Sequence, residues 1–288
     1  MGEYKKHHIV PFSVLKNFTS SEGKFFYYSK NLASKKIRLR NPSSVFCRNH
    51  LYSYLDNDGK KNPDVEKNYF KYLDTNVDPI INQILIAVRR DELPSLDQTQ
   101  KMIWNDFYIK QMARAPEWLD SEHIQTTLNN TYEISKKRIY EYCSDDNKRL
   151  LDDKDFEYRV KSQSRVQALK TRPEIAAGII KARGLFFVRI TNPKKSFIIG
   201  SNPLVRFSNR GTGRRDDNNT ELWYPIASDV AVSTGNTTEK ERLFHLENLH
   251  RHTKVIRRLN MQIYKQSTEI GGRSIQLIKS ISKDHRVI

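Results

Sequence analysis

The amino-acid sequence predicts an α+β protein. The first sixty residues and the last hundred contain short extended runs, whereas apolar residues in the middle recur at helical spacing. Turn residues such as Gly, Asn and Pro separate the short runs. The chain has no internal repeat and no low-complexity linker. We therefore expect one compact domain over residues 1–288, made of a mixed β region (1–60), a helical region (61–182) and a β region with a closing helix (183–288).

The first region is expected to hold a β-hairpin. The aromatic run Phe25–Tyr28 follows the turn residues Ser21–Gly23, and this pattern indicates a strand. Residues 35–39 are the expected partner strand. Asn57–Gly59 marks a loop that closes the region.

The central region is expected to form a helical bundle. Asn62–Asp64 opens the first helix, because proline is tolerated in a first turn. Asp78–Pro79 should start or kink the segment that follows. The strongest apolar stripe consists of Val77, Ile80, Ile81, Ile84, Leu85 and Val88. A further helix is predicted to begin within Leu93–Asp97 and to run to about Arg114, and others at about 117–143, 155–170 and 175–181, with Pro116 and Pro173 as breaks.

The last region is expected to contain a small antiparallel sheet. Its predicted strands are 185–190, 197–199, 222–226 and 230–233. The first two should flank a turn at Asn192–Pro193. Residues 210–220 form a polar loop, and a helix from 243 to about 265 closes the fold.

Composition and charge limit the class of protein. Hydrophobic residues make up 37% of 288, too many for a disordered polycation. No apolar run reaches the ~18 residues of a membrane span, and the start lacks the pattern of a secretion signal. Two cysteines, Cys47 and Cys143, cannot form a disulfide framework, so a cytoplasmic setting is expected.

The net charge of +17 favours a polyanionic partner, either nucleic acid or an anionic membrane surface, although solubility alone is an alternative. The cations are spread over predicted helices and strands, as in a groove that follows phosphates. The candidate nucleic-acid-binding residues are Lys36, Arg38, Arg40, Arg251, Lys254, Arg257 and Arg258. The alternative for the first three is a solvated strand edge.

A histidine pair at the start carries the clearest candidate chemistry. The segment Lys6-His7-His8-Ile9-Val10-Pro11 resembles the opening of HNH endonucleases, whose site closes with an asparagine and, nine residues later, a histidine. Asn41 and His50 have that separation. The resemblance implies His7 and His50 as ligands of Mg²⁺ or Mn²⁺, His8 as the base that activates water, and Asn41 as a bracing residue. The alternative is a hydrogen-bonded histidine at a strand end and an ordinary loop at His50.

A second resemblance extends over residues 8 to about 260. The segment His8-Ile9-Val10-Pro11-Phe12-Ser13-Val14-Leu15-Lys16-Asn17-Phe18 is similar to the opening of a prokaryotic family named domain of unknown function 4238. Blocks at Gln111–Pro116 and Phe197–Pro203 follow in the family's order. Ser201 stands where the family has an acidic residue. The resemblance implies a shared fold, a bacterial origin and an association with defence or toxin genes, but no activity.

Five polar residues in apolar surroundings form a candidate site: His8, Glu66, Asp74, Gln111 and Arg114. Glu66 and Asp74 are eight residues apart, about 12 Å along a helix, so they can hold one metal ion only if the helix bends. Their alternative role is ion pairing with neighbouring lysines. Gln111 and Arg114 share a helix face and could bind phosphate. The alternative for Arg114 is a cation at a helix C-terminus.

The closing helix offers a basic face rather than a metal site. His245 and His252 lie seven residues apart among arginines and lysines. Phe244 and Tyr264 could stack on bases, or they could belong to the core. No phosphate-binding loop or dinucleotide motif occurs.

The sequence therefore favours a metal-dependent nuclease that cleaves RNA or DNA, with His8, His7, Arg114 and Gln111 as catalytic residues and a role in bacterial defence or as a toxin. A non-catalytic nucleic-acid-binding or sensor module is the second hypothesis. The third is a component of a larger defence complex, with a partner protein or a second copy of the chain. No membrane partner is expected.

Overall fold

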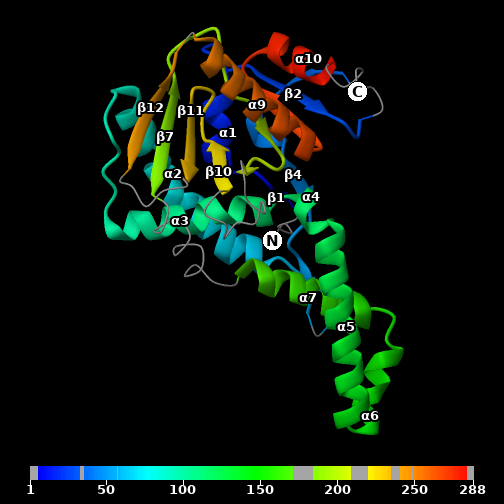
Figure 1. Cartoon of the computed structure of the whole chain (residues 1–288). Helices are drawn as coiled ribbons and strands as arrows, with labels where there is room; N and C mark the ends of the chain where they lie inside the picture. Colours follow the sequence, from blue (N-terminus) through cyan, green and yellow to red (C-terminus); the bar gives the residue numbers. More distant parts are fainter. Residues whose placement is uncertain are drawn as a thin grey trace.

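The computed structural model describes residues 6–32, 36–56, 58–170, 184–208, 220–234, 241–247 and 249–283. Helices and several small sheets alternate within it, which confirms the α+β class (Figure 1). The helix predicted at 175–181 and most of the loop predicted at 210–220 lie outside the described residues.

The helices follow the predicted order. They are α1 (Phe12–Leu15), α2 (Lys71–Arg89), α3 (Gln98–Ala113), α4 (Pro116–Leu119), α5 (Glu122–Tyr142), α6 (Asp145–Lys148), α7 (Phe156–Lys170), α9 (His250–Gln266) and α10 (Ile275–Lys283). Shorter turns are the 3₁₀ segments η1 (Lys16–Phe18), η2 (Pro42–Ser44) and η4 (Arg149–Asp152) and the π-helix η3 (Val65–Phe70). Asp97 caps α3 in a capping box with Gln100, which explains why this helix begins where the sequence indicated.

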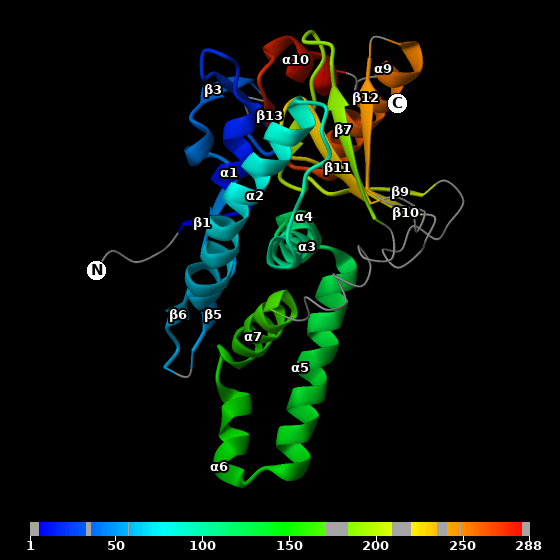
Figure 2. The same ribbon diagram turned by 90° about the vertical axis from the view of Figure 1, so that its left-hand side faces the viewer.

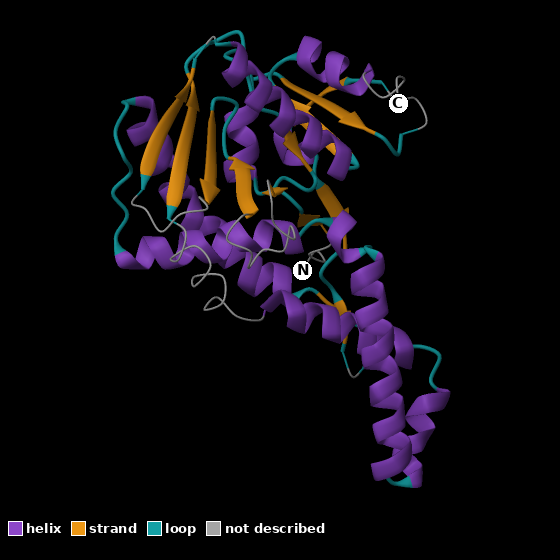
Figure 3. Ribbon diagram, in the orientation of Figure 1, coloured by secondary structure: helices purple, strands orange, loops and turns teal. Residues whose placement is uncertain are grey.

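The strands form two larger sheets and two small ones (Figure 3). The five-stranded sheet has the order β12-β7-β11-β10-β9, from Arg242–Leu246, Leu185–Ile190, Val230–Thr234, Thr220–Pro225 and Val205–Ser208. The four-stranded sheet has the order β3-β2-β13-β8, from Arg38–Arg40, Phe25–Ser29, Glu269–Gly272 and Ile199–Gly200. The small sheets pair β1 (Lys6–His8) with β4 (Cys47–Asn49) and β5 (Tyr54–Leu55) with β6 (Lys61–Asn62). All neighbouring strands are antiparallel except β12 and β7, which are parallel.

The predicted hairpin of β2 and β3 is confirmed, but its sheet also takes two strands, β13 and β8, from the last predicted region (183–288). The strands predicted on either side of the turn at Asn192–Pro193 belong to different sheets, because β8 pairs with β13 and β7 pairs with β11 and β12. The Phe197 N–H donates to the Ser228 carbonyl, which holds the connecting segment across the core instead of in a hairpin.

The start predicted for the helix at 243–265 lies before the observed start. Residues 242–246 form β12, where alternating burial and the register with β7 fix a strand, and α9 starts at His250. His245 and His252 therefore do not share a helix face. A further strand, β13, and a further helix, α10, follow α9.

Pro79 does not start a helix, because α2 begins at Lys71 and continues through the proline. A proline inside a helix removes one backbone hydrogen bond and costs about 3 kcal/mol. Each buried aliphatic side chain contributes about 1.5–3 kcal/mol. The whole predicted apolar stripe of α2 is buried, so the packing of that face offsets the cost of the proline.

The two larger sheets and their helices form the main body of the molecule. Helix α9 lies on one face of the five-stranded sheet and α2 on the other, with α3 across its lower end (Figures 1 and 2). Tyr108 of α3 donates to the Leu222 carbonyl of β10, and one apolar cluster joins α2, α3, α9 and both sheets. Helices α5, α6 and α7 project away from this body as an arm (Figure 2). No described helix is long and apolar enough to cross a membrane.

Candidate acid–base site

The two adjacent histidines lie on opposite faces of one short strand. Strand β1 pairs with β4, and alternation along the strand sends His7 and His8 in opposite directions. His7 is fully buried, its Nδ1 accepts the Tyr52 N–H at 2.9 Å, and its ring stacks on the Tyr52 ring. The His8 side chain keeps 32% of its surface exposed. Of the two, His8 is therefore the one that a substrate can reach.

The predicted metal ligands His7 and His50 lie near each other, but the described residues add no third ligand to them. The Nδ1 atom of His7 is engaged by backbone, and the His50 ring meets the His7 ring edge-on at 6.3 Å between centroids. Within the described part of the chain, no three His, Cys, Asp or Glu side chains are grouped to hold a metal ion. Asn41 caps the 3₁₀ turn η2 through the Ser43 N–H. We derive no catalytic step through a metal.

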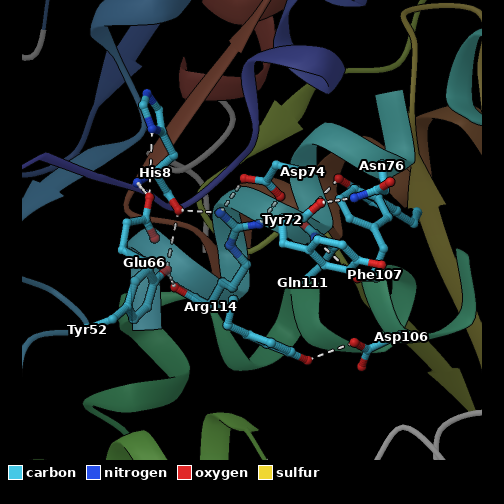
Figure 4. A network of polar contacts seen from close by, with 12 residues as sticks. His8, Tyr52, Glu66, Tyr72, Asp74, Asn76, Asp106, Phe107, Gln111 and Arg114 are labelled. Atoms are coloured by element: carbon cyan, nitrogen blue, oxygen red, sulfur yellow. Dashed lines mark hydrogen bonds and ion pairs between the residues drawn. The ribbon is translucent and has the colours of Figure 1, made fainter. Parts of the chain in front are cut away.

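Glu66 is the closest acidic neighbour of His8. Its Oε1 accepts the His8 backbone N–H at 3.0 Å and lies 3.9 Å from the His8 Nδ1 (Figure 4). Oε2 is buried and has no hydrogen-bond partner among the described residues. Burial raises the pKa of Glu66 from 4.5 to about 7, although the nearby Arg114 opposes that rise. Near neutral pH this carboxyl group can therefore hold or release a proton.

The π-helix explains how Glu66 and Asp74 come to act on the same strand. Eight residues make about 2.2 turns of a regular α-helix, which would rotate the two side chains apart. A π-helical turn contains more residues than an α-helical one. Glu66 lies in η3 and Asp74 in α2, so the wide turn brings their separation closer to two whole turns. Single π-turns of this kind are frequent at functional sites.

Arg114 ties Asp74 to the strand (Figure 4). Its guanidinium donates to both Asp74 carboxylate oxygens, at 2.6 and 2.9 Å, and to the His8 carbonyl at 2.9 Å. It also lies 4.4 Å from the centre of the Phe70 ring. Burial alone would lower the pKa of Arg114, but the adjacent Asp74 carboxylate raises it above its usual range.

The predicted phosphate-binding role of Arg114 does not suit this arrangement, because the side chain is fully buried and both of its terminal nitrogens, Nη1 and Nη2, donate to protein oxygens. Arg114 instead positions the His8 backbone. The same correction applies to Gln111, which is fully buried. Gln111 donates to the Phe107 carbonyl, and it accepts from the Tyr224 hydroxyl. Asp74 is held by Arg114, and Glu66 by the His8 N–H, so neither is arranged as a metal ligand.

His8 itself is held as a neutral base. Burial, followed by the positive charge of Arg114, lowers the pKa of the imidazole below 6.5. Near pH 7 the ring is therefore uncharged and can accept a proton. Because Nδ1 faces Glu66, the more distant Nε2 is the atom that is left to take a proton from another molecule (Figure 4).

The predicted cationic residues lie at two places on the surface. Arg38 and Arg40 lie on β3, the edge strand of the four-stranded sheet, and Lys36 is exposed just before it. Helix α9 buries Ile256, Leu259 and Ile263. It exposes the predicted cations Arg251, Lys254, Arg257 and Arg258.

The comparison with known proteins identifies a family. The family described as "Protein of unknown function (DUF4238)" matches residues 6–274, which include both strands of the β1–β4 pair and every residue of the network around His8. The chain belongs to the DUF4238 family. Neither the curated proteins nor the solved structures contain a match.

Two features of this DUF4238 protein escaped the sequence analysis. Tyr52 donates its hydroxyl hydrogen to the Arg114 carbonyl at 2.7 Å and packs on Phe70, so it joins the histidine strand to α3. Glu117 accepts from the Thr268 N–H at 2.7 Å and from the Ser201 hydroxyl, which ties α4 to the four-stranded sheet. Neither pairing has a signal in residue spacing, because the partners are 62 or more residues apart.

Proposed function

We propose that this protein cleaves phosphodiester bonds in nucleic acid by general acid–base catalysis, with His8 as the base. The observation that supports this most directly is the partly exposed, neutral imidazole of His8 beside the buried Glu66 carboxyl. Paired groups with displaced pKa values are typical of catalytic sites. The net charge of +17 favours nucleic acid as the substrate.

In the proposed reaction, the His8 Nε2 removes a proton from the hydroxyl group or water that attacks phosphorus. The new P–O bond forms as the P–O bond to the leaving nucleotide oxygen breaks, and that oxygen takes its proton from solvent. The imidazolium that forms is stabilised by the ionised Glu66, whose Oε1 lies 3.9 Å from Nδ1. Arg114 and Asp74 act as positioning residues, because Arg114 holds the His8 carbonyl. The rate should fall as the pH drops below the lowered pKa of His8, since the protonated ring cannot act as a base.

The test is cleavage of labelled single-stranded RNA, single-stranded DNA and duplex DNA by wild type and His8→Ala. Removal of a general base typically costs about 10²–10⁴-fold in rate. His123→Ala is the matched control, because His123 is an exposed histidine on α5. Each reaction is repeated with Mg²⁺, with Mn²⁺ and with EDTA, which measures any metal dependence directly.

Equal cleavage by wild type and His8→Ala would remove His8 from the mechanism. If wild type cuts none of the substrates but binds them, the second candidate function holds, which is binding without cleavage. The exposed cations of α9 favour that second function independently of His8.

A further inference from the structure

The five-stranded sheet presents a row of side chains that the acid–base site does not use. The register places Arg242, Phe186, Ser233, Trp223 and Val205 directly opposite one another across β12, β7, β11, β10 and β9. Paired residues on neighbouring strands point to the same face. Phe244 and Phe207 lie two residues further along their strands, so they share that face, Phe244 beside Val188 and Phe207 beside Glu221 on opposite sides of the row.

This face carries exposed aromatic surface. Phe244 is 44% exposed, and Phe186, Trp223 and Phe207 are partly exposed. Phe186 packs edge-to-face on Phe244, and Phe207 on Trp223, with the buried Ser233 between the two pairs. The Trp223 indole N–H donates to Glu221 at 2.8 Å, which fixes the orientation of the ring.

Helix α9 brings positive charge to the same face. Its Arg258 lies 4.4 Å from the centre of the Phe207 ring. The other exposed cations of α9 continue along the helix from there, and Arg242 lies at the opposite edge of the row. The packing of Arg258 on Phe207 places α9 on this side of the sheet, at its β9 edge, and α2 covers the other face (Figures 1 and 2).

We propose that this aromatic row, bordered by α9, binds single-stranded nucleic acid by stacking bases on Phe244, Phe186, Trp223 and Phe207. Aromatic side chains beside a positively charged groove are how proteins hold unpaired bases, because every base has a flat π face and a neighbouring phosphate. A duplex keeps its bases stacked inside and cannot offer them to the sheet. The inference rests on nucleic acid as the substrate of the proposed function, and it narrows that substrate to single strands.

The test measures binding separately from cleavage. Labelled single strands of about 15 nucleotides, as RNA and as DNA, and the matching DNA duplex are titrated into the His8→Ala protein. Fluorescence anisotropy gives the affinity, and tryptophan emission reports contact with Trp223. We expect tighter binding of both single strands than of the duplex, with quenching that Trp223→Phe reduces while affinity is kept.

Two further variants separate stacking from charge. Phe244→Ala should weaken single-strand binding about fivefold or more without changing its salt dependence. Arg258→Gln should weaken binding and reduce the slope of log K against log salt by about 0.7. Tyr140→Ala, an aromatic that is 70% exposed on α5, is the control and should bind as the parent does. Circular dichroism confirms that each variant is folded.

Equal affinity for duplex and single strands, or unchanged binding by Phe244→Ala and Arg258→Gln, would overturn the inference. A dimer in sedimentation that Phe244→Ala dissociates would overturn it as well, because the face would then hold a second copy of the chain. Failure of cleavage in wild type leaves these binding results unaffected, so this inference and the catalytic proposal fail separately.

Discussion

At the residue scale, burial decides what the polar side chains around His8 can do. Arg114 and Gln111 are as polar as His8, yet both are fully buried and engaged by protein atoms. His8 alone among these three reaches the surface, with 32% of its side chain exposed. The residues of this site that can exchange protons are therefore His8 and Glu66. Burial raises the pKa of the Glu66 carboxyl group.

The raised pKa of Glu66 predicts a pH dependence of stability. As pH rises from 4.5 to 7, the unfolded chain releases this proton while the folded protein retains it, so wild-type stability falls. Glu66→Gln keeps an oxygen for the His8 N–H and has no proton to lose. We expect the variant to gain up to about 3 kcal/mol relative to wild type across this window. Urea unfolding of both proteins at several pH values measures the difference, and parallel curves would contradict the buried-carboxyl explanation.

The buried ion pair of Arg114 and Asp74 predicts a large effect of breaking it. Arg114→Ala leaves Asp74 without its partner and the His8 carbonyl without a donor. We expect a loss of about 3–5 kcal/mol in the free energy of unfolding. Arg114→Ala combined with Asp74→Asn should lose less than Arg114→Ala alone, because no unpaired charge remains. Chemical denaturation of the variants tests this, and strictly additive losses would show that the two residues do not interact.

At the element scale, the π-helical turn η3 shapes the site around His8. The close contact between Gly271 and Phe25 shapes the four-stranded sheet. The π-helix η3 sets the rotation of Glu66 relative to Asp74, and it continues directly into α2. Strand β13 joins β2 to β8 and thereby connects the two ends of the chain. Gly271 of β13 lies directly against the ring of Phe25, which is fully buried.

Gly271 is therefore predicted to tolerate no side chain. A Cβ atom there would overlap the Phe25 ring, and the fully packed core leaves that ring no room to move. We expect Gly271→Ala to lower the free energy of unfolding by about 1–3 kcal/mol. Gly23→Ala is a useful comparison, because no atom lies within 4 Å of its Cβ position, although its positive φ of 71° adds strain of its own. Thermal unfolding compares the two, and a Gly271→Ala protein as stable as wild type would contradict the close packing.

At the scale of the whole molecule, the projecting helices carry little of the net positive charge, and the main body carries most of it. Residues 121–170, which contain the projecting helices α5, α6 and α7, carry ten Lys and Arg against nine Asp and Glu. Nearly all of the net charge of +17 therefore belongs to the rest of the chain. The long-range attraction for a polyanion should come from the main body, where the sheets and α9 lie.

This division predicts which cations matter for nucleic-acid binding. Neutralising Arg251, Lys254 and Arg258 on α9 with glutamine should reduce the slope of log K against log salt by roughly 2. The same change at Lys136, Lys137 and Arg138, which are exposed on α5, should leave the slope unchanged. Salt titrations of single-strand affinity compare the two triple variants. Equal slopes would show that the arm takes part in binding.

The sequence by itself determined the features that depend on neighbouring residues. Periodicity and turn residues predicted the α+β class, the hairpin of β2 and β3, the buried stripe of α2 and a helix start within Leu93–Asp97. The short ordered motifs also indicated the DUF4238 family, which the match over residues 6–274 confirms. These signals are local, because backbone propensity and one-sided burial act over a few residues.

Only the tertiary structure decided which polar residues meet and which are exposed. The contacts of His8 with Glu66 and Arg114 join residues 58 and 106 positions apart, and burial of Arg114 depends on the packing of Tyr52 and Phe70 around it. The same is true of the aromatic row on the five-stranded sheet, which five separate strands assemble. Side-chain burial is a property of the whole packed chain, so spacing along the sequence could suggest candidates for a site but could not separate the exposed base from its buried supports.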